Sequence, residues 1–365
     1  TNLSRYSPEG VPSMADARVI PIKPKDSKDR PKKKAPAKRP AAKRPPAAGS
    51  ARGSRGSGGA ATAAAHEEEP EVAKEHAPLP GAEPAPVAWD RKVADLLAFM
   101  RRRVTGDYEV DEFGYDRELT DRVLSAPLRP LYSKWFRVET RGLENIPDTG
   151  GALIVANHSG TVAIDSLMTS IALLDHHPAR RQLRMLGANL VFQTPLVGEY
   201  ARKSGSTLAC APDAERLLNK GELVGVWPEG FKGVGKPFSE RYKLQRFGRG
   251  GFVAAALRTK TPIIPCAIVG AEEIYPILSN AKTLARIMGV PYFPITPTFP
   301  LLGPLGLIPL PSKWIIEFGE PIYTDDFPDN AAEDPMLVFN LTDQVRETIQ
   351  QTLYKLLVAR RSVFL

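Results

Sequence analysis

The chain has 365 residues, with 49 Lys and Arg against 41 Asp and Glu and a formal net charge of +8 at pH 7. Residues 18–55 hold fourteen Lys and Arg but only two Asp, so this segment carries +12 and the remainder sums to −4. The basic character therefore belongs to the N-terminal segment and not to the folded body. The only cysteines, Cys210 and Cys266, lie in apolar contexts without metal-ligand spacing, and two cysteines this far apart suit a reduced cytoplasmic protein.

Residues 1–88 are dense in Pro, Ala, Gly and Ser and contain too little apolar surface to offset the entropy of folding. We expect this segment to be a disordered basic tail, without the apolar core of a signal peptide. Its basic clusters, such as Lys32-Lys33-Lys34, could attract an anionic membrane surface or remain a solvated arm. Nucleic acid is not expected as a partner, because no aromatic side chains interleave the basic residues.

The body begins with apolar residues at helical spacing over 89–104, followed by Arg101-Arg102-Arg103, which predicts an amphipathic helix with a basic end. A helical region over 118–136 is interrupted by Pro127 and Pro130. Strands and helices then alternate, which predicts an α/β fold: a single mixed-sheet domain with flanking helices. The expected strands cover residues 152–156, 184–188, 206–210, 223–227, 263–269 and 314–318, and the expected helices cover 164–174, 193–202, 212–219, 249–259 and 336–360. The expected organisation is a tail (1–88), a helical region (89–136), an α/β domain (137–325) and a C-terminal helical region (326–365).

Between Arg286 and Lys313 the sequence contains no charged residue but seven prolines. This length could cross a bilayer as a helix, but the prolines exclude an ordinary helix. Lipid-exposed irregular backbone is also excluded from the depth of a membrane. The segment is therefore interpreted as a loop that dips into the membrane interface or covers an acyl-chain groove, or else as a buried apolar loop.

His158 is the one histidine of five that follows an apolar strand, within Asn157-His158-Ser159 and ahead of Asp165. A histidine with a carboxylate partner is the minimum apparatus for removing a proton from a hydroxyl group. The alternative is a structural, hydrogen-bonding histidine.

A second cluster, Trp227-Pro228-Glu229-Gly230-Phe231-Lys232, follows the strand at 223–227 and precedes a basic run that includes Lys236, Arg241 and Lys243. Cations beside a carboxylate suit a ligand with phosphate and hydroxyl groups, although a solvated basic face is the alternative. Residues 230–236 also match the nucleotide phosphate loop up to its last position, where Pro237 replaces the Ser or Thr that would hold magnesium. Nucleotide hydrolysis is therefore not expected.

Four ordered blocks resemble the glycerolipid acyltransferase superfamily, whose members include 1-acylglycerol-3-phosphate acyltransferases. Asn157-His158…Asp165 resembles its Asn-His-x₄-Asp block, and Trp227-Pro228-Glu229-Gly230-Phe231-Lys232 its Phe-Pro-Glu-Gly-Thr-Arg block. Pro262-Ile263-Ile264-Pro265 is similar to its late strand, and Phe318-Gly319-Glu320-Pro321-Ile322 to its closing segment. The resemblance covers about residues 130–325.

Two departures from the family pattern stand out. Six residues, not four, separate His158 from Asp165. The segment that aligns with the family's second block, residues 205–211, lacks its Asp and Arg. The missing Arg would help to grip an acceptor phosphate, so the identity of the acceptor stays open.

The resemblance implies acyl transfer from acyl-CoA, as co-substrate and without a further cofactor or metal, to a glycerol phosphate or lysophospholipid acceptor in phospholipid biosynthesis. His158 would be the general base and Asp165 would orient it. The residues expected to bind substrate are Asn157, Ser159, Glu229, Gly230, Lys232, Arg241 and Lys243. No Gly-x-Ser-x-Gly is present, which agrees with a scheme that needs no protein nucleophile.

Three other functions remain open: transfer to a glycolipid or monoacylglycerol, hydrolysis of a thioester or ester, and non-catalytic lipid binding. The expected location is cytoplasmic and peripheral, on the inner face of the cell membrane. The helix near 89–104, the proline-rich segment and the basic tail would hold the chain there.

Overall fold

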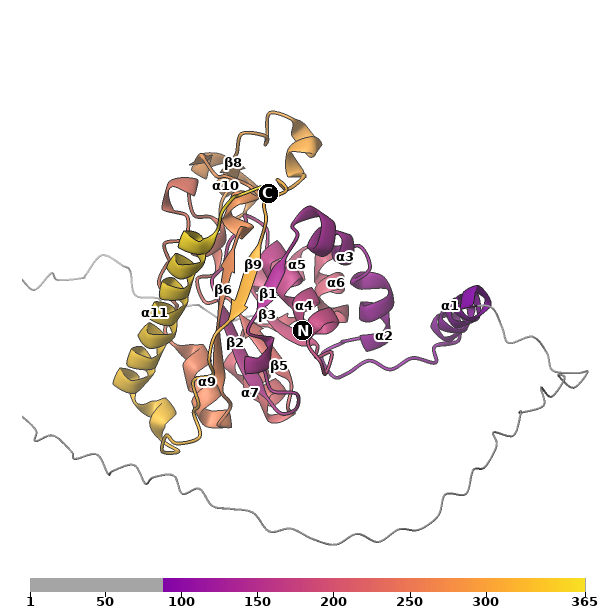
Figure 1. Cartoon of the computed structure of the whole chain (residues 1–365), viewed down its shortest axis with the longest axis horizontal. Helices are drawn as coiled ribbons and strands as arrows, with labels where there is room; N and C mark the ends of the chain where they lie inside the picture. The colour runs from indigo at the N-terminus through magenta and orange to yellow at the C-terminus, as the bar shows by residue number, and fades with distance from the viewer. Residues whose placement is uncertain (1–87, 365) are drawn as a thin grey trace, which may run out of the picture. The chain divides into compact units, whose positions relative to one another are not determined.

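The fold is taken from a computed structural model that describes residues 88–364 (Figure 1). The expected disordered tail at 1–88 lies, except for Ala88, outside the described residues. A seven-stranded mixed sheet forms the body, in the order β1-β9-β6-β2-β5-β3-β4. Its strands are β1 (Glu139–Arg141), β2 (Ala152–Ala156), β3 (Leu183–Gly187), β4 (Thr207–Leu208), β5 (Leu223–Val226), β6 (Ile263–Val269) and β9 (Ile315–Phe318).

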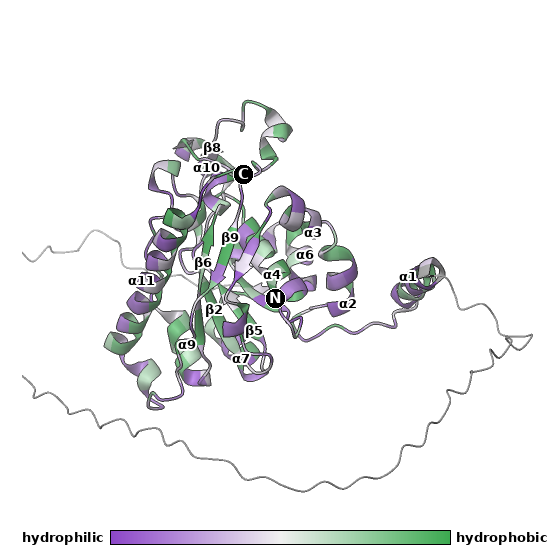
Figure 2. Ribbon diagram, viewed as in Figure 1, coloured by the Kyte–Doolittle hydropathy of each residue, from purple (hydrophilic) through white to green (hydrophobic). Residues whose placement is uncertain are grey.

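The central strands are almost entirely apolar because both faces of the sheet are covered. Every residue of β2 and β6 is buried, as expected for parallel strands between two layers of helices. β2 pairs in parallel with both β5 and β6, whereas β9 is antiparallel to β6. Figure 2 shows these central strands as predominantly hydrophobic.

Helices cover the two faces of the sheet (Figure 1). On one face α4 (Ile164–His176) and the helical turns near Tyr132 pack against one core cluster. On the other, α7 (Ala211–Asn219), α9 (Gly251–Thr259) and α11 (Pro335–Ala359) enclose a second cluster.

The long helix α11 begins where Asp334 accepts hydrogen bonds from the backbone N–H groups of Met336 and Leu337, with Pro335 in the first helical turn. This is a common way to start a helix. Apolar side chains at helical spacing then form its buried stripe. They are Val338, Leu341, Val345, Ile349, Leu353 and Leu356.

The remaining elements are short, apart from α1. The helices are α1 (Ala88–Thr105), α2 (Arg117–Leu119), α3 (Leu128–Pro130), α5 (Asn189–Gln193), α6 (Val197–Lys203), α8 (Phe231–Val234) and α10 (Lys282–Met288). Two π-helical turns lie at Thr120–Leu124 and Leu131–Trp135. The 3₁₀ turns are Leu143–Asn145, Phe238–Glu240, Ala271–Glu273, Gly303–Leu307 and Ala331–Glu333, and a small antiparallel pair joins β7 (Ser279–Asn280) to β8 (Pro294–Ile295).

The predicted fold class, a single α/β domain with a mixed sheet and flanking helices, is confirmed. The expected helix at 193–202 is instead two helices, α5 and α6, because Pro195 interrupts the segment. The edge strand β1 was not expected, since Glu139-Thr140-Arg141 carries no apolar pattern.

The charge-free segment 287–312 forms β8 and one 3₁₀ turn, and much of its apolar surface faces outward. Its most exposed large side chains are Ile287, Met288, Leu301, Leu302, Leu305, Leu307 and Ile308. Within residues 88–364, no helix has the length and apolar composition that crossing a bilayer requires.

Candidate active site

The ends of three adjacent parallel strands bring the candidate residues together. β2 lies between β5 and β6, so the segments that follow these strands meet at one edge of the sheet. They carry His158 after β2, Glu229 after β5 and Glu272 after β6. Open α/β sheets commonly bind ligands beyond the carboxyl ends of their strands.

His158 is held by Asp165 from the first turn of α4. The distance between His158 Nδ1 and Asp165 Oδ2 is 2.8 Å. The same Asp165 oxygen accepts the backbone N–H of Ser159, and its other oxygen accepts that of Ser166. The Asp165 carboxylate is fully buried, whereas the His158 side chain is 15% exposed. Asp165 therefore holds the imidazole from the interior, and the imidazole remains accessible to a ligand.

The six residues between His158 and Asp165 are accommodated by compact turns. Gly160 has a φ of 91° and Thr161 a φ of 63°, in the left-handed region. The backbone N–H of Val162 donates to Gly160 O, and that of Ile164 donates to Val162 O, each at 2.6 Å. The chain therefore folds back on itself and returns Asp165 to the imidazole.

The imidazole of His158 lines a cavity of about 580 Å³. The other lining residues come from the 161–167 segment, β3, α5, α6 and the segment that follows β5, and most are apolar. Among the described residues that line the cavity there is no Lys, Arg, Asp or Glu. Such a volume and lining suit an apolar ligand with few polar groups.

Glu229 and Asn157, whose side chains are expected to bind substrate, are not among the residues that line this cavity. Glu229 accepts the backbone N–H of His158 at 2.9 Å with one oxygen and that of Gln245 at 2.7 Å with the other. The Asn157 amide exchanges two hydrogen bonds with the backbone of Ile268 on β6. Both side chains therefore hold the strand end that carries His158.

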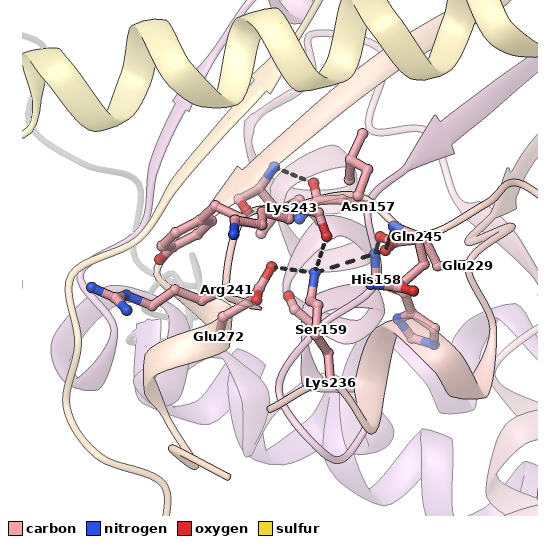
Figure 3. A network of polar contacts seen from close by, with 12 residues as sticks. Asn157, His158, Ser159, Glu229, Lys236, Arg241, Lys243, Gln245 and Glu272 are labelled. Atoms are coloured by element: carbon pink, nitrogen blue, oxygen red, sulfur yellow. Dashed lines mark hydrogen bonds and ion pairs between the residues drawn. The ribbon is translucent and has the colours of Figure 1, made fainter. Parts of the chain in front are cut away.

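A buried ammonium group lies between two carboxylates behind His158 (Figure 3). Lys236 Nζ is 3.0 Å from Glu272 Oε1 and 3.8 Å from Glu229 Oε2, and it also donates to Lys243 O at 3.0 Å. The Lys236 side chain is only 2% exposed. Burial raises the pKa of Glu272 to about 7, although Lys236 opposes the shift. Burial also raises the pKa of Glu229, against the influence of Lys236 and the two backbone donors.

Gly233 permits the close approach of α8 to this assembly. A Cβ at this position would lie 2.6 Å from His158 O and 2.8 Å from Glu229 Cβ. A side chain would therefore push α8 away from the strand end.

The other predicted site residues are dispersed. Gly230 lines the cavity. The hydroxyl group of Ser159 is buried and has no hydrogen-bond partner among the described residues. Lys232 is exposed and outside the cavity lining, and Arg241 and Lys243 line a different cavity.

Three residues of the network around Glu229 were not recognised in the sequence: Lys236, Glu272 and Gln245. Lys236 belonged to the basic run, where nothing distinguished it from the exposed cations. Glu272 lies three residues after the end of the apolar strand β6, much as His158 lies just after β2. This position at a strand end could have marked Glu272 as a site residue.

Comparison with known proteins identifies the family. The family model described as "Acyltransferase" matches residues 137–269, a range that contains His158, Asp165 and Glu229. An uncharacterized protein from Mycobacterium tuberculosis is 61% identical over 272 residues, which cover 74% of this chain and 76% of that protein. This chain belongs to the glycerolipid acyltransferase superfamily.

Among the relatives of this acyltransferase that carry functional names are one bacterial and one animal protein. The "1-acyl-sn-glycerol-3-phosphate acyltransferase" of Bacillus subtilis is 27% identical over 165 residues, 42% of this chain and 73% of that protein. The "DGAT1/2-independent enzyme synthesizing storage lipids" of Gallus gallus is 28% identical over 222 residues, 60% of each chain.

Proposed function

We propose that this acyltransferase moves a fatty acyl group from acyl-CoA to a hydroxyl group of a glycerol phosphate or lysophospholipid acceptor. The observation that carries the proposal is the contact between His158 Nδ1 and Asp165 at the wall of an apolar cavity. An acyl chain is the kind of ligand that such a cavity favours, because each buried methylene contributes about 0.8 kcal/mol.

In the proposed reaction His158 is the general base. When the Nδ1–H group of His158 donates a hydrogen bond to the Asp165 carboxylate, the lone pair of Nε2 is free to accept the proton of the acceptor hydroxyl. The hydroxyl oxygen then attacks the thioester carbonyl, while Asp165 stabilises the imidazolium cation. The tetrahedral intermediate expels the CoA thiolate, which takes the proton from His158, so one ester and one thiol replace one alcohol and one thioester.

Release of the CoA thiol from palmitoyl-CoA, in the presence of lysophosphatidic acid or glycerol phosphate, tests this mechanism. We expect His158→Gln to lower the rate by about 10²- to 10⁴-fold, the contribution of a positioned general base. His176→Gln is the matched control, since this histidine is exposed and lies at the end of α4. An unchanged rate in His158→Gln would refute the mechanism.

One observation favours a second acceptor class, a glycolipid or monoacylglycerol. The described residues that line the His158 cavity include no cation that would pair with an acceptor phosphate. The name of the Gallus gallus relative, an enzyme synthesizing storage lipids, points in the same direction. Mass spectrometry of the products from one acyl-CoA and a mixed pool of acceptors separates the two classes. Steady CoA release without any acceptor would instead indicate a hydrolase.

We further propose that the enzyme acts as a peripheral protein on the inner, anionic face of the cell membrane. Supporting this, α1 exposes an apolar stripe at helical spacing beside basic residues of its last turn, the pattern of an interfacial helix. The stripe consists of Trp89, Val93, Leu96, Leu97, Met100 and Val104. Sedimentation with anionic vesicles at low salt tests the location, and a protein that stays in the supernatant would contradict it.

A further inference from the structure

A second cavity, of about 460 Å³, lies beside the C-terminal end of α11. One wall is the segment that contains Arg241 and Lys243, and a second wall is formed by Tyr354, Leu357 and residues 360–363. This cavity shares no lining residue with the one that contains His158. The acyl-transfer site therefore does not account for it.

The cavity carries unmatched positive charge. Its one acidic lining residue, Glu273, is already engaged, because it accepts a hydrogen bond from Arg360 at 2.7 Å and another from the Tyr242 hydroxyl at 2.9 Å. Arg241, Lys243 and Arg361 then have no carboxylate partner within the part of the chain that the structure describes. Cations that converge on one concave surface repel one another unless an anion is present.

The first wall is fixed by hydrogen bonds to its backbone. Gln350 of α11 donates to Tyr242 O at 2.7 Å and accepts the N–H of Leu244 at 2.9 Å. Between these two residues, Lys243 O accepts a hydrogen bond from the buried Lys236 at 3.0 Å. The backbone that carries Arg241 and Lys243 is therefore set before any ligand arrives.

The second wall is fixed in a similar way. The guanidinium group of Arg360 donates hydrogen bonds to Lys313 O at 2.7 Å and to Val363 O at 3.1 Å, in addition to the one that Glu273 accepts. Arg137 also donates to Phe364 O at 2.8 Å. The chain beyond α11 is thus held against the body, with Arg361 at the cavity.

We propose that this second cavity binds a phosphate group through Arg241, Lys243 and Arg361. Guanidinium groups match phosphate oxygens in pairs and an ammonium group adds a point charge, so this set of side chains suits a phosphomonoester. Two sources offer that chemistry: the headgroup of an anionic lipid and the nucleotide end of CoA. The second source rests on the proposed acyl transfer, whereas the first does not.

Calorimetric titration of the full chain distinguishes the sources without any turnover. The two probes are dihexanoylphosphatidic acid, a soluble lipid, and adenosine bisphosphate, the nucleotide end of CoA. The test variant combines Arg241→Ser, Lys243→Ser and Arg361→Ser. These side chains are exposed, so we expect the variant to fold, with an unchanged thermal unfolding midpoint.

The matched control combines Arg117→Ser, Lys134→Ser and Lys355→Ser, which remove the same charge from exposed positions outside both cavities. Because the N-terminal segment is the same in all the proteins, any contribution from its basic residues cancels.

We expect the unmodified chain and the control to bind at least one probe with equal affinity. The test variant should bind that probe with an affinity at least about tenfold lower. Binding of the lipid alone assigns the headgroup, and binding of the nucleotide alone assigns CoA. The proposal is overturned if the unmodified chain binds neither probe or if the test variant binds as tightly as the control. Since binding is read without turnover, failure of the acyl-transfer assay would leave this result standing.

Discussion

The backbone N–H of His158 donates to Glu229 Oε1 at 2.9 Å, so the carboxylate of the Pro-Glu-Gly block fixes the backbone of the proposed base. The other Glu229 oxygen is occupied by Gln245 N. We therefore expect Glu229 to be a positioning residue in the proposed reaction and not a ligand of the acceptor.

Replacing Glu229 should thus affect turnover more than acceptor binding. Glu229→Gln keeps the shape but turns one acceptor oxygen into a donor group that faces a backbone N–H. We expect kcat to fall by about tenfold or more with the KM for the acceptor nearly unchanged. Steady-state kinetics at varied acceptor concentration measures both constants. A raised KM with normal kcat would return Glu229 to the role of acceptor ligand.

Removing the ammonium group of Lys236 should destabilise the whole fold. Lys236→Met leaves Glu229 and Glu272 buried without a cation, which typically costs about 3–5 kcal/mol. Lys243→Met is the matched control, because it removes an exposed charge from the same segment and should change stability by less than about 0.5 kcal/mol. Urea unfolding gives both values, and equal midpoints would contradict the prediction.

Glu272 should make stability depend on pH near neutrality. Its pKa is about 7 in the folded protein against a reference value of 4.5. Between these values the folded state binds more protons than the unfolded state, so the free energy of unfolding falls as pH rises and levels off above about 7. We expect Glu272→Gln to make this fall smaller, and the part that comes from Glu229, whose pKa is also raised, to remain. Urea unfolding at a series of pH values tests it, and parallel curves for the two proteins would refute it.

Filling the His158 cavity should shorten the preferred acyl chain. Ala188 lines this cavity, and Ala188→Phe would occupy part of it. Each methylene that no longer fits costs about 0.8 kcal/mol, or about fourfold in rate. We expect palmitoyl-CoA to lose far more activity than octanoyl-CoA. Ala359→Phe, on the exposed end of α11, serves as the control, and a uniform loss across chain lengths would argue against an acyl cavity.

The exposed apolar side chains of the proline-rich segment should contribute to membrane attachment. Leu301 is 83% exposed and Leu302 52% exposed. We expect Leu301→Ser with Leu302→Ser to weaken sedimentation with vesicles by about tenfold at high salt, where electrostatic attraction is screened. Phe339→Ser with Val358→Ser removes similar surface from α11 as a control. Equal effects of the two variants would show that attachment does not use this segment.

The sequence predicted the central strands best, because burial on both faces of the sheet requires an uninterrupted run of apolar residues. The runs at 152–156 and 263–269 coincide with β2 and β6 to the residue, because strands covered on both faces must be apolar throughout. β1 at the edge has no such requirement, and its position depends on pairing with β9, about 175 residues away along the chain. No local pattern encodes that pairing.

For the site, the sequence brought His158 and Asp165 together but did not show what the neighbouring side chains face, and it did not identify Lys236 and Glu272. His158 and Asp165 were paired correctly from composition and order. The side-chain directions of Glu229 and Asn157 depend on backbone groups of distant segments, Gln245 and Ile268, which a linear pattern does not contain. Lys236 could likewise not be separated from neighbouring cations until Glu272 was seen beside it.

The folded-back turn at Gly160 and Thr161 has a consequence for how such enzymes are recognised. The contact between imidazole and carboxylate is set by where the loop returns, not by how many residues it contains. A motif search that demands four intervening residues passes over this chain, although its histidine and aspartate meet at hydrogen-bond distance. Searches that allow a variable gap, filtered by the later Pro-Glu-Gly block, would recover proteins of this kind.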